Sequence, residues 1–121
     1  MPIVEVEIVL KPDEAISGTW ASELADQLGT IFGSLKNGTW VKVHGIPDMH
    51  YAENGGKEEG VYPVFVSVVK SRLPEPIDMQ REVDAMIAAI AQICRRDPSL
   101  VHVIYQPEGR GHVAFGGKIV T

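Results

Sequence analysis

The sequence predicts an α/β (α+β) fold in which two βαβ units form a four-stranded mixed sheet with both helices on one face. The chain has 121 residues, 45% hydrophobic and 22% charged, which is typical of one globular domain spanning 1–121. Short strand-like runs alternate with longer helical runs, in the order strand, helix, strand, loop, strand, helix, strand, tail. This order repeats in residues 2–56 and 63–117 at a nearly constant offset of about 60 residues, which indicates an internal duplication.

The first half is predicted to contain a strand over 3–10, a helix over about 14–35 and a strand over 40–46. The first strand alternates and then becomes fully apolar, as expected for a strand with a well-buried face. Asp13 is a suitable N-cap for the helix, and Asn37-Gly38 ends it. The apolar residues at helical spacing are Ile16, Trp20, Leu24, Leu28, Ile31, Phe32 and Leu35.

The second half restarts the pattern after a polar loop over 47–60. A strand is predicted over 63–69, followed by a helix that begins near Asp78, and then by a strand over 100–105. Asp97-Pro98 separates this helix from the last strand, because proline cannot continue a helix. The apolar stripe of the second helix comprises Val83, Met86, Ile87, Ile90, Ile93 and Cys94.

The glycine-rich tail over 109–121 is predicted to form a short hairpin or an edge strand. Within each βαβ unit the strands should pair in parallel through a right-handed crossover. Both helices then cover one sheet face, and the opposite face carries Val and Ile that nothing in this chain covers. We therefore expect an oligomer, a trimer or a dimer, that buries this face.

Composition disfavours several functional classes. Lys and Arg total 11 against 16 Asp and Glu, so the net charge is −5 and no basic cluster offers a footprint for nucleic acid. No apolar run approaches the roughly 20 residues that cross a bilayer, and no signal peptide is evident, so we expect a cytoplasmic protein. With one cysteine and four histidines at unrelated spacings, we expect no metal site, and the glycines of the tail do not form a dinucleotide fingerprint.

Pro2 is the first candidate for chemistry. Removal of Met1 would leave Pro2 with a free secondary amine at the end of a buried strand. An α-amino group has a pKa of about 7.7–8.0, and burial lowers it because the cation loses its hydration. Such an amine is a suitable base for abstracting a proton next to a carbonyl group. The alternative is a chemically silent proline, which is common at position two.

Several stretches resemble the tautomerase superfamily, in its 4-oxalocrotonate tautomerase and macrophage migration inhibitory factor branches. Residues 2–8 are similar to the amino-terminal proline strand of that family. Residues 43–48, followed by 54–56, are similar to the Val-His, Pro-Asp and Gly-Gly pattern of the migration inhibitory factors. Residues 101–104 and 111–117 are similar to the closing strand and glycine tail of the small bacterial members. The resemblance covers nearly the whole chain and implies a homotrimeric enzyme that needs no cofactor.

The resemblance also implies roles for individual residues. Pro2 would be the general base, and Arg72, in the loop after the third strand, would bind a substrate carboxylate through a bidentate pair. Arg72 is equally consistent with a solvated arginine at a strand end. Lys36 resembles a lysine that lines the pocket of the migration inhibitory factors. The simpler interpretation is a lysine at the end of a helix, where its positive charge interacts favourably with the helix dipole. Phe115, together with Val113, would form an apolar wall that keeps Pro2 neutral.

The closing strand departs from the family pattern. Small members place an arginine there that reaches the proline of a neighbouring subunit, whereas this chain has Lys42 in the first half and His102 in the second. This departure puts the usual diacid substrate in doubt. His102 would still be able to donate a hydrogen bond to a carbonyl or enolate oxygen. The alternative is a histidine that completes a strand face.

The predicted function is a keto-enol tautomerase that catalyses a 1,3-proton shift on a small 2-oxo or enol carboxylic acid. The same site would also suit promiscuous hydratase or dehalogenase activity. The alternative is a non-catalytic oligomeric module that binds small molecules or regulates another protein, because one fold hosts many functions. The two differ in whether a free Pro2 amine is required.

Overall fold

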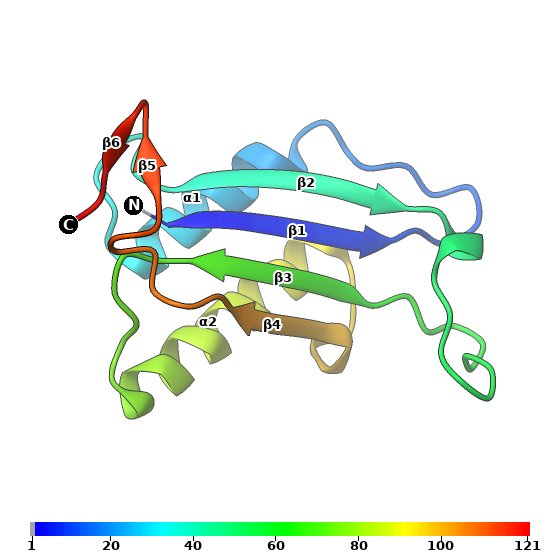
Figure 1. The fold of residues 1–121 in the computed structure, drawn as a ribbon. Coiled ribbons are helices and arrows are strands. Elements are labelled where there is room, and N and C mark those ends of the chain that lie inside the picture. Colours follow the sequence, from blue (N-terminus) through cyan, green and yellow to red (C-terminus); the bar gives the residue numbers. More distant parts are fainter. Residues whose placement is uncertain (1) are drawn as a thin grey trace.

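The computed structural model describes residues 2–121; Met1, whose removal the proposed chemistry requires, lies outside the described residues. None of the helices in this part of the chain has the length and apolar character needed to span a bilayer. The elements, shown in Figure 1, are β1 (Ile3–Val9), α1 (Trp20–Phe32), β2 (Trp40–Ile46), a 3₁₀ turn (Asp48–His50), β3 (Val64–Val69), α2 (Pro76–Cys94), a 3₁₀ turn (Pro98–Leu100), β4 (Val101–Tyr105), β5 (Ala114–Phe115) and β6 (Lys118–Ile119).

The four long strands form one mixed sheet in the order β2-β1-β3-β4. β1 pairs in parallel with β2, and β3 pairs in parallel with β4, as expected for two βαβ units. The central pair, β1 and β3, is antiparallel, with Ile3 opposite Val69. The predicted four-stranded mixed sheet is therefore confirmed. β5 and β6 form a separate hairpin, which confirms the predicted structure of the tail.

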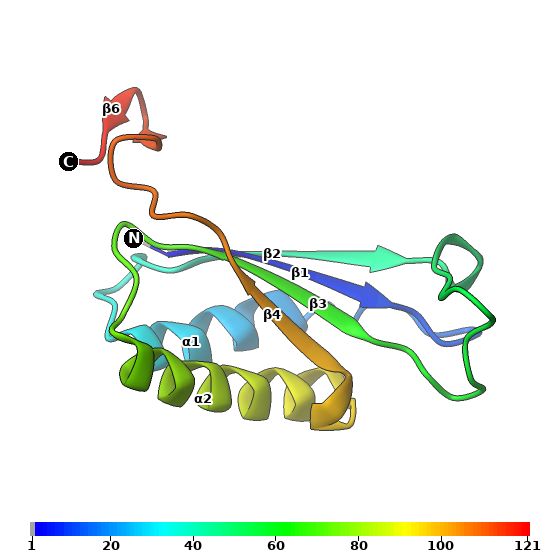
Figure 2. The same ribbon diagram turned by 60° about the horizontal axis from the view of Figure 1, so that its bottom comes forward.

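Both helices pack on the same face of the sheet, as predicted (Figure 2). Alternate residues of β1 and β3, such as Val4 and Val66, point toward the helices and are fully buried, as are Leu28 of α1 and Ile90 of α2. Burying each aliphatic side chain of this size stabilises the fold by about 1.5–3 kcal/mol relative to exposure. The apolar periodicity of the sequence thus defines the core.

The first helix is shorter than the predicted 14–35. Asp13 has a positive φ of 63° and does not cap it. The carboxylate of Glu14 instead accepts hydrogen bonds from the Lys11 backbone N–H and from the guanidinium of Arg96, which keeps this segment irregular until Thr19. At the other end, Gly33 adopts the left-handed conformation and stops the helix. Leu35, predicted on the core face, is 87% exposed as a result.

The second helix begins two residues earlier than the predicted Asp78. Pro76 lies in its first turn. A proline there costs no helical hydrogen bond, because the first N–H groups of a helix have no partner inside the helix. Its end near Cys94 and the following strand agree with the prediction.

The sheet face opposite the helices is uncovered in this chain, as predicted, but it is not simply apolar. The register places Glu5, Lys42 and His44 on this face beside Phe65 and Ile104. Glu5 and Lys42 form an ion pair at 2.8 Å. The same register also places Ile3, Val69 and Ile104 on this face, so the prediction that it carries Val and Ile is confirmed. The fully buried Val residues face the helices, because a sheet covered on one side places most of its aliphatic residues there.

Candidate functional site

Pro2 is buried directly before β1, at the end of the sheet where β2 begins and β3 ends. Its backbone carbonyl accepts the Trp40 N–H at 3.0 Å. Since β1 is a central strand with a partner on each side, the position of Pro2 is fixed by the sheet itself.

An aromatic pair lies at this end of the sheet. The Trp40 and Phe115 rings meet edge to face, with centroids 5.0 Å apart and an angle of 83° between their planes. These two side chains, with Asn37 and Gly38, line a cavity of about 340 Å³. Its lining is largely aromatic, and an apolar environment favours a neutral amine over a charged one. The predicted wall residue Phe115 thus lies at the end of the sheet that holds Pro2.

Arg72 is held at the same end. It follows β3 by three residues, and the antiparallel register places the end of β3 beside the start of β1. Arg72 is exposed, and within residues 2–121 it forms no ion pair with a carboxylate. Its guanidinium is therefore available for an anionic ligand, which it would bind through two parallel hydrogen bonds.

His102 lies at the other end of the sheet. It pairs with Phe65, which pairs with Glu7 of β1, five residues from Pro2. At about 3.3 Å per residue, this is roughly 17 Å along the strand. The His102 ring is exposed and packs against Phe65, with ring centroids 5.5 Å apart. Within one chain, His102 and Pro2 cannot act on the same small molecule.

Lys36 lies after α1 and is exposed. It precedes Asn37 and Gly38, which line the Trp40–Phe115 cavity, but its own side chain borders a neighbouring hollow of about 330 Å³. Lys36 is therefore adjacent to the candidate site but does not line the cavity.

Sequence reasoning missed a polar cluster at the Pro2 end of the molecule. Lys70 Nζ lies 2.8 Å from Oε2 of Glu82, and the Tyr105 hydroxyl donates to Oε1 of the same carboxylate at 2.7 Å. The ammonium group also lies 4.8 Å from the centroid of the Phe32 ring. Burial, and secondarily the bond to Glu82, raises the pKa of Tyr105. No sequence spacing links these residues, because they come from three elements, α1, α2 and β4, and from the loop after β3.

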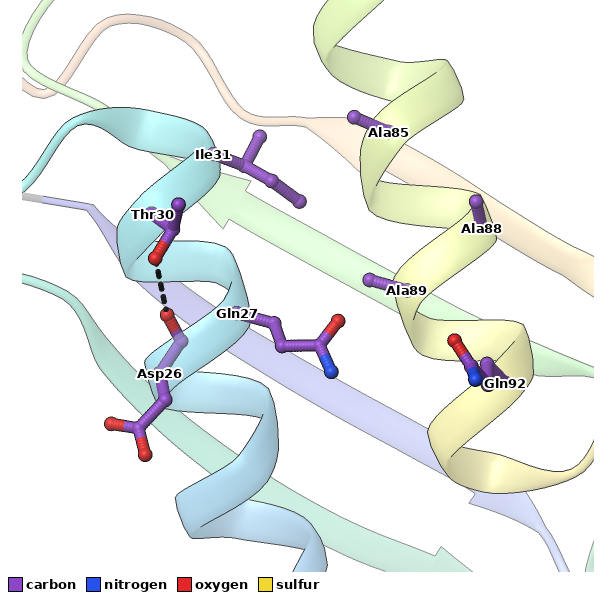
Figure 3. A pocket seen from close by; sticks show the side chains of 8 residues that line it. All are labelled: Asp26, Gln27, Thr30, Ile31, Ala85, Ala88, Ala89 and Gln92. Carbon is purple, nitrogen blue, oxygen red and sulfur yellow. Dashed lines mark hydrogen bonds between the residues drawn. The ribbon is translucent and has the colours of Figure 1, made fainter.

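A groove of about 530 Å³ runs between the two helices, and Pro2 is not among the residues that line it (Figure 3). Ala85, Ala88 and Ala89 of α2 form one wall, and Gln27 of α1 extends into the space between the helices. The only ionised side chain in its lining is Asp26, which would repel an anionic substrate. The groove therefore does not suit the acid chemistry that the sequence predicts.

Within residues 2–121, neither the cysteine nor a metal-ligand cluster offers a second reactive centre. Cys94 is buried, and this burial raises the pKa of its thiol to about 11, so little thiolate forms near neutral pH. Among residues 2–121, no three His, Cys, Asp or Glu side chains are grouped so that they could hold a metal ion.

No protein-family model matches the chain, and no curated protein matches its sequence. Solved structures do match. Pt0534 inactivated by 2-oxo-3-pentynoate has a TM-score of 0.77 and 15% identity, covering 98% of this chain and 95% of that one. The fused 4-OT symmetric trimer has a TM-score of 0.78 and 11% identity, covering 98% and 94%. Macrophage migration inhibitory factor from Oncomelania hupensis has a TM-score of 0.76 and 13% identity, covering 99% and 82%.

This chain has the tautomerase-superfamily fold. In this tautomerase fold, Pro2, Phe115 and Arg72 are gathered at one end of the sheet, although the tail and the loop that carry Phe115 and Arg72 are far from Pro2 in sequence. His102 is the sequence-predicted site residue that the fold places at the opposite end.

Proposed function

We propose that this protein is a tautomerase that catalyses a 1,3-proton shift on a small 2-oxo or enol carboxylic acid. The observation that supports this most is the position of Pro2: it is buried directly before a central strand and is hydrogen-bonded to the backbone of Trp40, whose side chain lines an aromatic cavity. Once Met1 is removed, the Pro2 nitrogen is a secondary amine with a free lone pair. A structural neighbour, Pt0534, is inactivated by 2-oxo-3-pentynoate, which is consistent with a ligand of the 2-oxo acid class.

The proposed reaction uses Pro2 as both base and acid. The amine takes a proton from an enol hydroxyl or from the carbon next to the carbonyl, and then returns it to another atom of the same conjugated system. The aromatic environment of Trp40 and Phe115 keeps the amine neutral before the reaction. Arg72 holds the substrate carboxylate, which fixes the orientation of the reacting carbon.

We further propose that the active form is a homotrimer. One structural neighbour is a fused 4-OT symmetric trimer, and this chain leaves one sheet face uncovered. His102 is exposed on that face, so a neighbouring copy would bring it toward a second Pro2. There it would donate a hydrogen bond to the oxygen on which negative charge develops.

The test is an enol-to-keto assay with phenylpyruvate and 2-hydroxymuconate on untagged protein whose intact mass confirms loss of Met1. We expect turnover that falls at least 100-fold in Pro2→Ala, because a general base contributes about 10²–10⁴ to a rate. Pro63→Ala is the matched control, since Pro63 opens the second βαβ unit but has no free amine. It should keep its turnover per folded molecule.

Equal background rates in wild type and Pro2→Ala would contradict the proposal for these substrates. The non-catalytic binding module would then be the better interpretation. A chemical check does not need turnover: a secondary amine adds to an alkynyl ketone without a leaving group. Treatment with 2-oxo-3-pentynoate should therefore raise the mass by one whole reagent, located at Pro2 by peptide mapping.

A further inference from the structure

Glu108 joins the segment that follows β4 to the loop that follows β3. Its Oε2 accepts the backbone N–H of Leu73 at 2.8 Å, across 35 positions of sequence. Its Oε1 lies 3.8 Å from Nη2 of Arg110. A carboxylate that accepts a backbone N–H forms a charge-assisted hydrogen bond, which is stronger than a bond between neutral groups.

Backbone hydrogen bonds join the same two segments next to this contact. The Gly109 N–H donates to the Lys70 carbonyl at 2.7 Å, and the Arg110 N–H donates to the Ser71 carbonyl at 3.3 Å. A β-carbon at Gly109 would lie 3.3 Å from Cγ1 of Val69 and 3.4 Å from the Lys70 carbonyl oxygen, so the segments approach closely. We call this set of contacts the latch; it comprises Glu108, Gly109 and Arg110 on the tail and Lys70, Ser71 and Leu73 on the loop.

The latch connects two parts of the candidate site. Arg72 lies between Ser71 and Leu73, the two loop residues whose backbone groups the tail binds. Phe115 follows on the β5-β6 hairpin, which projects from the open side of the sheet (Figure 2). The backbone hydrogen bonds that the structure shows for residues 111–120 stay within the tail. The position of the β5-β6 hairpin relative to the sheet therefore depends on the latch and on the contact between Phe115 and Trp40.

We propose that Glu108 is a positioning residue that fixes Arg72 relative to Phe115, and so sets the fit of a carboxylate substrate at Pro2. This inference rests on the proposed function. Glu108 acts through the Leu73 N–H and does not touch the substrate. Without its carboxylate, the Leu73 N–H donates to water instead. The distance between the loop and the tail is then no longer fixed. The loss falls mainly on substrate binding, because Pro2 is positioned independently by the sheet.

The first experiment compares Glu108→Ala, Glu108→Gln and the distant control Glu59→Ala, which removes an exposed carboxylate from another loop. We expect Glu108→Ala to raise KM about tenfold while kcat stays within about threefold. Glu108→Gln should recover most of the loss, because its amide oxygen still accepts the Leu73 N–H. Glu59→Ala should match wild type.

A double-mutant cycle with Arg72→Ala separates positioning from a general loss of stability. If Glu108 acts through Arg72, the two changes together raise KM by clearly less than the product of the single effects. Amide hydrogen exchange at Leu73 should also become at least tenfold faster in Glu108→Ala, but not in Glu108→Gln. Additive effects on KM, or unchanged exchange at Leu73, would overturn the inference.

Binding measurements distinguish this inference from the proposed function. Phenylpyruvate affinity is measured from Trp40 fluorescence, with buried Trp20 giving a constant background. If wild type binds the acid without turning it over, the proposed function fails, and a tenfold weaker affinity of Glu108→Ala still supports the positioning role. Equal affinities in the two proteins, or no binding to wild type, would overturn it.

Discussion

Arg96 is a buried charged residue that closes the sheet end opposite Pro2. Its Nε donates to the Tyr62 carbonyl at 2.9 Å, and its Nη2 donates to the Val9 carbonyl at 3.0 Å. Nη1 and Nη2 also bind the two carboxylate oxygens of Glu14, at 3.0 and 2.6 Å, and Nη1 donates to the Cys94 carbonyl. One guanidinium thus joins four parts of the chain: the end of β1, the segment just before β3, the end of α2 and the segment before α1. A buried arginine is tolerated here because all of its donor nitrogens have partners.

Glu14 makes the stability of this cluster dependent on pH. Hydrogen bonds from Arg96 hold the pKa of Glu14 below its ordinary value of 4.5, although partial burial opposes the shift. A lowered pKa in the folded state stabilises the protein above the unfolded pKa, and this contribution disappears as pH falls through the folded pKa. Glu14→Gln should therefore lower the free energy of unfolding at pH 7 by about 3 kcal/mol, the lower end of the effect expected when a buried charge loses its partner, because Glu14 is partly exposed.

The measurement is urea unfolding of both proteins at pH 7 and at pH 3. The difference should shrink at the lower pH, because below the ordinary pKa of 4.5 the unfolded chain takes up a proton at Glu14 and the advantage of the ionised folded state decreases. An unchanged difference between the two pH values would show that the Glu14 charge does not contribute.

At the scale of elements, the two helices end in the same backbone conformation with different residues. Gly33 ends α1 at φ 66°, and Arg95 ends α2 at φ 56°. The left-handed region suits glycine because it has no β-carbon, whereas other residues are strained there. The Gly33 N–H bonds to the Thr30 carbonyl, and the Ser34 N–H bonds to the Gly29 carbonyl, which satisfies the free end of α1. The end of α2 adopts the same geometry at a steric cost, because Arg96 must turn into the core.

This contrast gives a paired prediction. Gly33→Ala should destabilise the protein by about 1 kcal/mol, because alanine is strained at positive φ. Arg95→Gly should change stability in the opposite direction, by about 0.5 kcal/mol, because relief of strain exceeds the added freedom of the unfolded chain. Both side-chain positions are exposed, so packing does not confuse the comparison. Thermal unfolding followed by circular dichroism measures both; a shift of the same sign in both variants would contradict this account.

For the whole molecule, the dominant feature is the layer arrangement, with helices on one face of the sheet and none on the other (Figure 2). Phe65 and Ile104 lie on the open face, and Ile104 is 53% exposed. Charged residues such as Glu5 and Lys42 accompany them and are paired with each other. A mixed face of this kind suits an interface between copies, where apolar residues provide area and charged pairs provide specificity.

Substitution on this face tests the proposed trimer. Wild type should sediment at about three times the mass of one chain, and Ile104→Glu should sediment as a monomer with an unchanged far-ultraviolet spectrum. Burial of an unpaired carboxylate at an interface is the reason for the expected dissociation. Ile77→Glu is the control, because Ile77 is 67% exposed on α2, on the other side of the sheet. A monomeric wild type, or dissociation by both substitutions equally, would contradict the proposal.

Much of this fold could be predicted from local sequence patterns. Alternation defined the strand over 40–46 to the residue, and helical spacing identified both helices. Pro2 could also be identified as a candidate base, because an amino-terminal proline has its chemistry regardless of the fold around it. Errors arose where a distant residue overrides a local preference: Glu14 binds Arg96, 82 positions away, and does not enter the helix.

The order of elements, the core positions and the candidate base can be derived from the sequence, because they depend on periodicity and on the chemistry of single residues. Which residues contact each other follows only from the folded structure. It brought Phe115 to Trp40 and Glu108 to Leu73, and it placed His102 far from Pro2 within one chain. Contacts between distant segments depend on sheet register and on the path of the tail, and neither leaves a periodic signal in the sequence.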